Sequence, residues 1–150
     1  DKRLVVQQSP GQFMKFLMSY RFALFWAACF GLTGVLLGAM GAHGPLRLKL
    51  DQAGTHQNWE TAVHYQLTHA LALLFVAIWL KHSSGESLRR VLWAWRCWMI
   101  GTLFFSGSIY WLSLGGPRLV GPITPLGGVA LLIGWALLLL EAAWQRKPAA

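Results

Sequence analysis

The sequence predicts an all-α fold: an integral membrane four-helix bundle with short loops and both termini cytoplasmic. The first supporting observation is the composition. Hydrophobic residues make up 55% of the 150 residues and charged residues only 12%, against the ~25% charge typical of a soluble domain. So few charges cannot cover the surface with water-facing groups, so lipid is the expected environment for most of it.

The second observation is a set of four apolar runs, at residues 22–42, 62–80, 91–114 and 119–140. About 20 apolar residues in a helix cross the ~30 Å hydrocarbon core of a bilayer. Backbone groups in lipid must be bonded within the protein, so each run is predicted to be a helix. The four-helix domain then covers residues 21–144. It is preceded by an amphipathic or flexible tail at residues 1–20 and followed by a basic tail at residues 145–150.

The third observation is the placement of the basic residues. Four spans put both termini and the middle loop on one side of the membrane, together with ten basic residues: Lys2, Arg3, Lys15, Arg21, Lys81, Arg89, Arg90, Arg96, Arg146 and Lys147. The other side receives three, which are Arg47, Lys49 and Arg118. Because Lys and Arg concentrate in cytoplasmic loops, both termini are predicted to be cytoplasmic, in a bacterial inner membrane or its organellar equivalent.

The first run carries glycines at steps of three, four and three: Gly31, Gly34, Gly38 and Gly41. This spacing places them on one helix face, where small residues let another helix approach closely. The sequence favours a partner helix within the same chain, with a helix of another subunit as the alternative.

Polar residues gather at the first two runs. His43 closes the first, and Glu60, His64, Tyr65 and His69 open the second on the same side of the membrane. Residues four apart on a helix are neighbours, so these side chains predict either a polar network that holds helices together or a pocket for a quinone or lipid. Haem or a metal is a weaker alternative. Ser106 and Tyr110 add hydroxyl groups from the third run.

No catalytic constellation or metal site is predicted. The five acidic residues are Asp1, Asp51, Glu60, Glu86 and Glu141, at termini, in loops or near helix ends. A Ser-His-Asp arrangement is therefore not expected, and the missing buried acids disfavour a transporter or channel. The net charge of +8 lies at the ends of apolar runs, which argues against nucleic-acid binding. Cys29 and Cys97 are predicted to be buried free thiols.

Several motifs occur in a fixed order: Gly38-Ala-Met-Gly-Ala-His-Gly44, Trp59-Glu-Thr-Ala-Val-His-Tyr65, His69-Ala-Leu-Ala-Leu-Leu74, Phe105-Ser-Gly-Ser-Ile-Tyr110, Ile123-Thr-Pro-Leu-Gly-Gly128 and Gly134-Trp135. Together they resemble the domain of unknown function 423 family of bacterial and mitochondrial membrane proteins. The resemblance implies a four-helix inner-membrane protein and brings no established activity. His43, Tyr65, His69, Ser106, Tyr110 and Pro125 match positions typical of that family. The tail before Tyr20 is longer and more basic than the resemblance implies.

The expected function is that of a non-catalytic accessory or assembly subunit packing against a larger inner-membrane complex, respiratory or photosynthetic. The expected partners are the lipid bilayer and other membrane subunits. The alternative is a small quinone- or lipid-binding protein that uses His43, Tyr65 and His69. Apart from such a bound quinone or lipid, no cofactor is expected.

Overall fold

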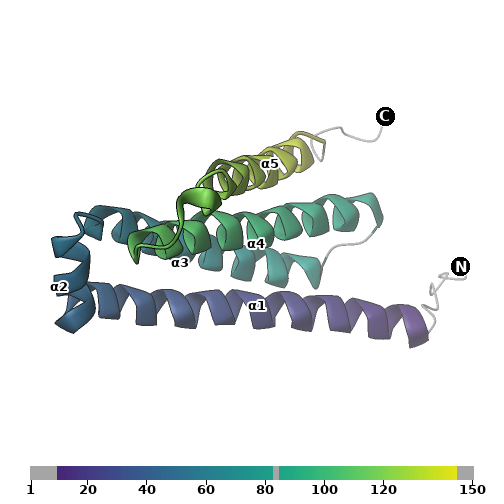
Figure 1. Cartoon of the computed structure of the whole chain (residues 1–150). Helices are drawn as coiled ribbons and strands as arrows, with labels where there is room; N and C mark the ends of the chain where they lie inside the picture. Colours follow the sequence, from purple (N-terminus) through teal and green to yellow (C-terminus); the bar gives the residue numbers. More distant parts are fainter. Residues whose placement is uncertain (1–9, 83–84, 145–150) are drawn as a thin grey trace, which may run out of the picture.

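The computed structural model describes the backbone of residues 10–82 and 85–144, and the side chains of residues 20–82 and 87–144. Within these ranges the chain forms five α-helices and one short 3-10 helix, η1, and no strand. The elements follow one another as α1 (Pro10–Ala42), α2 (Gly44–Gln52), α3 (His56–Leu80), α4 (Gly85–Ser113), η1 (Arg118–Val120) and α5 (Ile123–Trp144) (Figure 1).

The four long helices cover the four predicted runs, but their ends differ. α1 has 33 residues and begins at Pro10, so residues 10–20 of the predicted tail belong to the first helix. α3 and α4 each begin six residues before the predicted run, at His56 and Gly85. Residues 1–9 and the predicted basic tail at 145–150 lie outside the described residues.

A short helix, α2, occupies part of the connection between the first two predicted runs. Gly44 has a φ of 73°, a left-handed conformation that glycine adopts without strain, and the chain turns there between α1 and α2. Pro45 stands in the first turn of α2, where its missing N–H costs nothing. Leu50 is fully buried and anchors α2 to the rest of the fold.

The four long helices pack in chain order: α1 against α3, α3 against α4, and α4 against α5 (Figure 1). Consecutive long helices run antiparallel, so α1 and α4 run in the same direction. One contact between α1 and α4 is that of Phe22, whose ring centroid lies 5.9 Å from that of Trp95. The result is an open row with α1 at one edge and α5 at the other.

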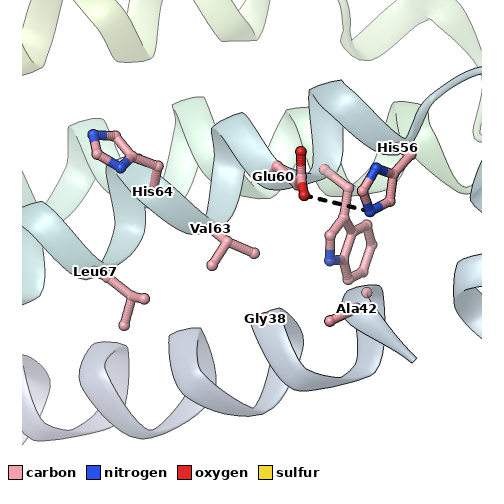
Figure 2. Close-up of a pocket in the computed structure, with 9 residues that line it drawn as sticks. Gly38, Ala42, His56, Glu60, Val63, His64 and Leu67 are labelled. Carbon is pink, nitrogen blue, oxygen red and sulfur yellow. Dashed lines mark ion pairs between the residues drawn. The ribbon is translucent and has the colours of Figure 1, made fainter.

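Three of the predicted packing glycines face α3. A Cβ on Gly41 would collide with the Trp59 indole, one on Gly34 with the Leu67 side chain, and one on Gly38 would lie 3.2 Å from Val63. Figure 2 shows Val63 and Leu67 pointing from α3 toward α1. Gly31 differs, because no described residue of another helix lies within 4 Å of the position of its Cβ. The close approach to α3 thus uses the last three glycines of the stripe.

A second set of glycines, which the sequence analysis did not single out, joins α4 to α5. A Cβ on Gly127 would collide with the backbone of Phe105, one on Gly101 with Leu131, and one on Gly134 with the Trp98 indole. The glycines come from both helices and stand opposite large residues. Because each glycine lies opposite a larger residue of the other helix, the backbones of α4 and α5 can approach closely.

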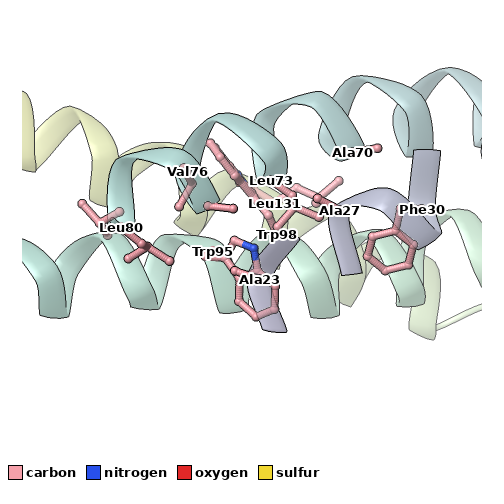
Figure 3. Packing of buried hydrophobic residues seen from close by; sticks show 12 residues of the cluster. Ala23, Ala27, Phe30, Ala70, Leu73, Val76, Leu80, Trp95, Trp98 and Leu131 are labelled. Atoms are coloured by element: carbon pink, nitrogen blue, oxygen red, sulfur yellow. The ribbon is translucent and has the colours of Figure 1, made fainter. Parts of the chain in front are cut away.

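The apolar core lies where α1, α3 and α4 meet. Ala23 and Ala27 of α1 face Leu73 and Val76 of α3, with the Trp95 and Trp98 indoles of α4 beside them (Figure 3). Large indoles fill the space that the small alanines leave, as close packing requires.

Three helical segments within the described ranges are long and apolar enough to cross a membrane: Tyr20–Ala42, His56–Leu80 and Arg118–Trp144. α4 has the length, with 29 residues, but is not among them. Its composition explains this, because the stretch after Arg96 is diluted by serine, glycine and tryptophan residues. Length and composition therefore support three spans. Whether α4 is the fourth predicted span depends on its packing against α3 and α5.

Candidate functional site

A groove between α1 and α3 encloses about 400 Å³ near the end of the row that carries α2. Its lining residues are Gly38, Gly41, Ala42, His56, Trp59, Glu60, Val63, His64 and Leu67. Trp59 fixes one wall, because its Nε1 donates a hydrogen bond of 2.9 Å to the Leu37 carbonyl. The polar residues stand along the α3 rim, while Val63 and Leu67 form an apolar floor toward α1 (Figure 2).

A histidine and a carboxylate lie near each other at the rim of the groove. His56 Nε2 is 3.6 Å from Glu60 Oε1, and the Glu60 side chain is 64% exposed. His64 stands one turn further along α3 and is also exposed. The groove therefore combines a polar, accessible edge with an apolar interior, as an amphiphile would need.

A second cluster surrounds His69, which is only 5% exposed. Its Nδ1 lies 2.8 Å from the Tyr65 carbonyl, so the neutral ring donates from Nδ1 and leaves Nε2 as an acceptor. Nε2 is buried and has no hydrogen-bond partner among the described residues. In a membrane interior such an unsatisfied group is costly, and it marks a place where a ligand donor or a water could bind.

Aromatic rings from three helices enclose this histidine. Tyr65 stacks on it with ring centroids 6.0 Å apart, and Trp98 and Trp135 present edges at 6.1 Å and 6.4 Å. Phe105 closes the group at 4.5 Å from Tyr65. Because Tyr65 and Trp135 are 39% and 49% exposed, they separate His69 from the surroundings of the protein.

The site residues proposed from the sequence thus lie in several separate parts of the structure. Glu60 and His64 line the α1–α3 groove, and Tyr65 and His69 belong to the aromatic cluster. His43 is exposed as the N-cap of α2, and within the described part of the chain it makes no side-chain contact with Tyr65 or His69. The structure therefore does not bring His43, Tyr65 and His69 together as one pocket.

The two hydroxyl residues of α4 that the sequence singled out, Ser106 and Tyr110, are both turned inward. Ser106 is 1% exposed, and its Oγ has no partner among the described residues. Tyr110 donates a hydrogen bond of 2.9 Å to Gln66 Oε1. Gln66, 5% exposed, was missed by the sequence analysis, although a lone amide inside an apolar run could have revealed it.

Glu141 is a further residue whose environment the sequence did not reveal. It lies near the end of α5, as its position suggests, yet it is fully buried. Its Oε2 accepts a hydrogen bond of 2.5 Å from Arg90 Nε on α4. A carboxylate at 0% exposure retains its charge only with such a partner. The acidic residues are therefore not all outside the packed interior.

Metal-ligating side chains are scattered. Across residues 20–82 and 87–144, whose side chains are described, no three His, Cys, Asp or Glu side chains come together in a way that could hold a metal ion. What the site offers chemically is hydrogen bonding, one exposed carboxylate and aromatic surface.

The apolar helices, the lipid-compatible surface and the sites between helices define a small integral membrane protein. The family model described as "Protein of unknown function (DUF423)" matches residues 37–128, and the chain belongs to this family. The matched segment contains the α1–α3 groove and the residues of the His69 cluster except Trp135.

Relatives carry names that agree with this class. The UPF0382 inner membrane protein YgdD of Escherichia coli (strain K12) is 38% identical over 131 residues, covering 83% of this chain and 92% of its own. UPF0382 membrane proteins of Staphylococcus haemolyticus and Staphylococcus epidermidis are 39% and 43% identical, over 80% and 73% of this chain and 93% and 84% of theirs. No solved structure matches the chain significantly.

Proposed function

We propose that the protein is a non-catalytic accessory or assembly subunit of a larger inner-membrane complex, respiratory or photosynthetic. The observation that carries this proposal is the length of α1. The Tyr20 ring lies 6.0 Å from the ammonium of Lys81, the residue that follows α3. α1 therefore continues for ten residues, from Pro10 onward, beyond the end of the helix against which it packs.

An extension of this kind needs support from outside the chain. Ten residues of helix add about 15 Å, and most helical stability in proteins comes from packing of an amphipathic face. The sequence of the extension contains Phe13, Phe16 and Leu17 at helical spacing, together with Lys15. A partner subunit with an apolar surface beside the membrane would stabilise it.

The proposal includes four spans with both termini in the cytoplasm. α4 packs beside α3 at one end, where the Trp59 and Tyr110 rings are 4.6 Å apart. It packs beside α5 at the other end, through Arg90 and Glu141. A bilayer that encloses α3 and α5 along this length also encloses α4. The asymmetry of basic residues then gives the orientation.

The test is native mass spectrometry of the full chain, isolated from its own membrane in mild detergent, beside a variant lacking residues 1–19. We expect additional subunits at fixed stoichiometry with the full chain, and their loss from the variant. Deletion of residues 145–150 serves as the control and should leave the partners bound. A lone monomer from the full chain would contradict the proposal.

The unpaired Nε2 of His69 favours a second function, binding of a quinone or lipid within the aromatic cluster. A quinol hydroxyl could donate to Nε2 while its ring packs against Tyr65 or Trp135. The measurement is the quinone content of lipids extracted from the purified protein, compared with the whole membrane. His69→Leu should abolish an enrichment that His64→Leu, on an exposed position of the same helix, leaves intact. The absence of any enrichment would argue against this function.

A further inference from the structure

We propose that the groove between α1 and α3 is a binding site for a phospholipid with an ammonium headgroup. The headgroup interacts with Glu60, and one acyl chain lies on the floor formed by Gly38, Val63 and Leu67. This inference stands apart from the accessory role, since it concerns a lipid ligand and not a protein partner.

The position of the groove fits a lipid. His56 opens α3, so the polar end of the groove lies at the predicted non-cytoplasmic surface of the membrane. Leu67 is eleven residues further, which corresponds to about 16 Å along the helix. The groove therefore extends from the headgroup level into the hydrocarbon. Its volume of about 400 Å³ lies within the range of small-molecule sites, roughly 300 to 1,000 Å³.

The groove is held open by the packing of its walls. Gly38 and Gly41 contribute no side chain, so the surface of α1 is flat at this point. Trp59 cannot swing into the space, because it rests on Gly41 and is bonded to the Leu37 carbonyl. A site whose shape exists before binding loses less entropy when the ligand arrives.

The charge of the rim selects the headgroup. Among the described lining residues, Glu60 is the acidic one and no Lys or Arg is present. Its carboxylate is accessible, and only one of its oxygens faces His56, at 3.6 Å. An ammonium can donate hydrogen bonds to the remaining oxygen, whereas an anionic headgroup would meet a like charge. Complementarity therefore favours phosphatidylethanolamine over phosphatidylglycerol.

The test is a titration of the delipidated full chain in detergent at pH 8, followed by native mass spectrometry, with the two lipids carrying identical acyl chains. We expect tighter binding of phosphatidylethanolamine, and a loss of about fivefold in its affinity in Glu60→Gln, as for an exposed charge pair of up to ~1 kcal/mol. Asp51→Asn removes an acid outside the groove and should leave the affinity unchanged.

A second pair of variants tests the floor. Val63→Phe places a ring in the groove and should abolish binding, whereas Val35→Phe makes the same change on an exposed face of α1 and should not. Equal affinity for both lipids, or binding that survives Val63→Phe, would overturn the proposal. Because Glu60 is exposed, Glu60→Gln should fold like the unaltered protein and keeps the test decisive even if Val63→Phe unfolds.

Discussion

Tyr110 on α4 and Gln66 on α3 form a hydrogen bond of 2.9 Å in the packed interior, with the tyrosine hydroxyl as donor. The Gln66 amide continues the contact to α1, donating to the Phe30 carbonyl at 2.9 Å and to Thr33 Oγ1 at 2.8 Å. One amide thus joins three helices. On α3 it follows Tyr65 of the aromatic cluster and precedes Leu67 of the α1–α3 groove, and its hydrogen bonds connect α3 to α1 and α4.

Replacing Gln66 by Leu should destabilise the protein by about 1–2 kcal/mol, because it leaves the Tyr110 hydroxyl without its buried partner. Tyr110→Phe removes one hydrogen bond and should cost less, about 0.6 kcal/mol, as for typical bonds between membrane helices. Thermal unfolding in detergent, followed by tryptophan fluorescence, gives both values. The double variant should show coupling, and strictly additive effects would contradict the hydrogen bond.

Two adjacent glycines of α5 should respond oppositely to alanine. A Cβ on Gly127 would collide with the Phe105 backbone, whereas one on Gly128 would lie 3.7 Å from the Phe105 ring, an ordinary contact. Gly127→Ala should therefore destabilise the protein by about 1–3 kcal/mol through overpacking. Gly128→Ala should stabilise it by up to ~1 kcal/mol through helix propensity. The same unfolding assay decides, and equal effects would mean that α4 and α5 do not approach so closely.

The Arg90–Glu141 pair should matter more than any exposed charge. Glu141→Ala removes the buried carboxylate that bonds Arg90, whose side chain is 24% exposed, and should cost about 1.5–3 kcal/mol, as for a hydrogen bond between charged groups. Arg96→Ala removes an exposed arginine whose described contact is the Trp93 ring, 5.1 Å from its Cζ, and should cost at most ~1 kcal/mol. Unfolding in detergent compares the two. A Glu141→Ala variant as stable as Arg96→Ala would show that Arg90 and Glu141 do not bond to each other in the membrane.

Reporter fusions can determine the orientation of the chain in the membrane. A fluorescent protein after residue 150 should fluoresce, because the C-terminus is predicted to be cytoplasmic. Alkaline phosphatase inserted at Gly54, in the turn between α2 and α3, should be active on the opposite side. Phosphatase activity at the C-terminus, with an inactive Gly54 fusion as control, would reverse the predicted orientation. Activity at both positions would instead place Gly54 and the C-terminus on one side and count against four spans.

The sequence alone determined the helical class, the membrane environment and the family. These properties depend on features that are local or summed along the chain: the length of an apolar run, the share of charged residues and the order of motifs. The glycine stripe also showed which face of α1 is suited to close packing, because a helix repeats every 3.6 residues whatever it packs against.

Tertiary structure decided which residues meet. Sequence spacing does not contain the register between helices, so it could not show that Gln66 bonds Tyr110, or that Glu141 near a helix end is buried against Arg90. The sequence also suggested one pocket for His43, Tyr65 and His69, because His43 and the start of the second run lie on one side of the membrane. In the structure His43 is exposed at the turn into α2. A groove between α1 and α3 exists only because glycines on one helix face large side chains on the other. Such pairings arise from the relative position of two helices, and no single helix encodes them.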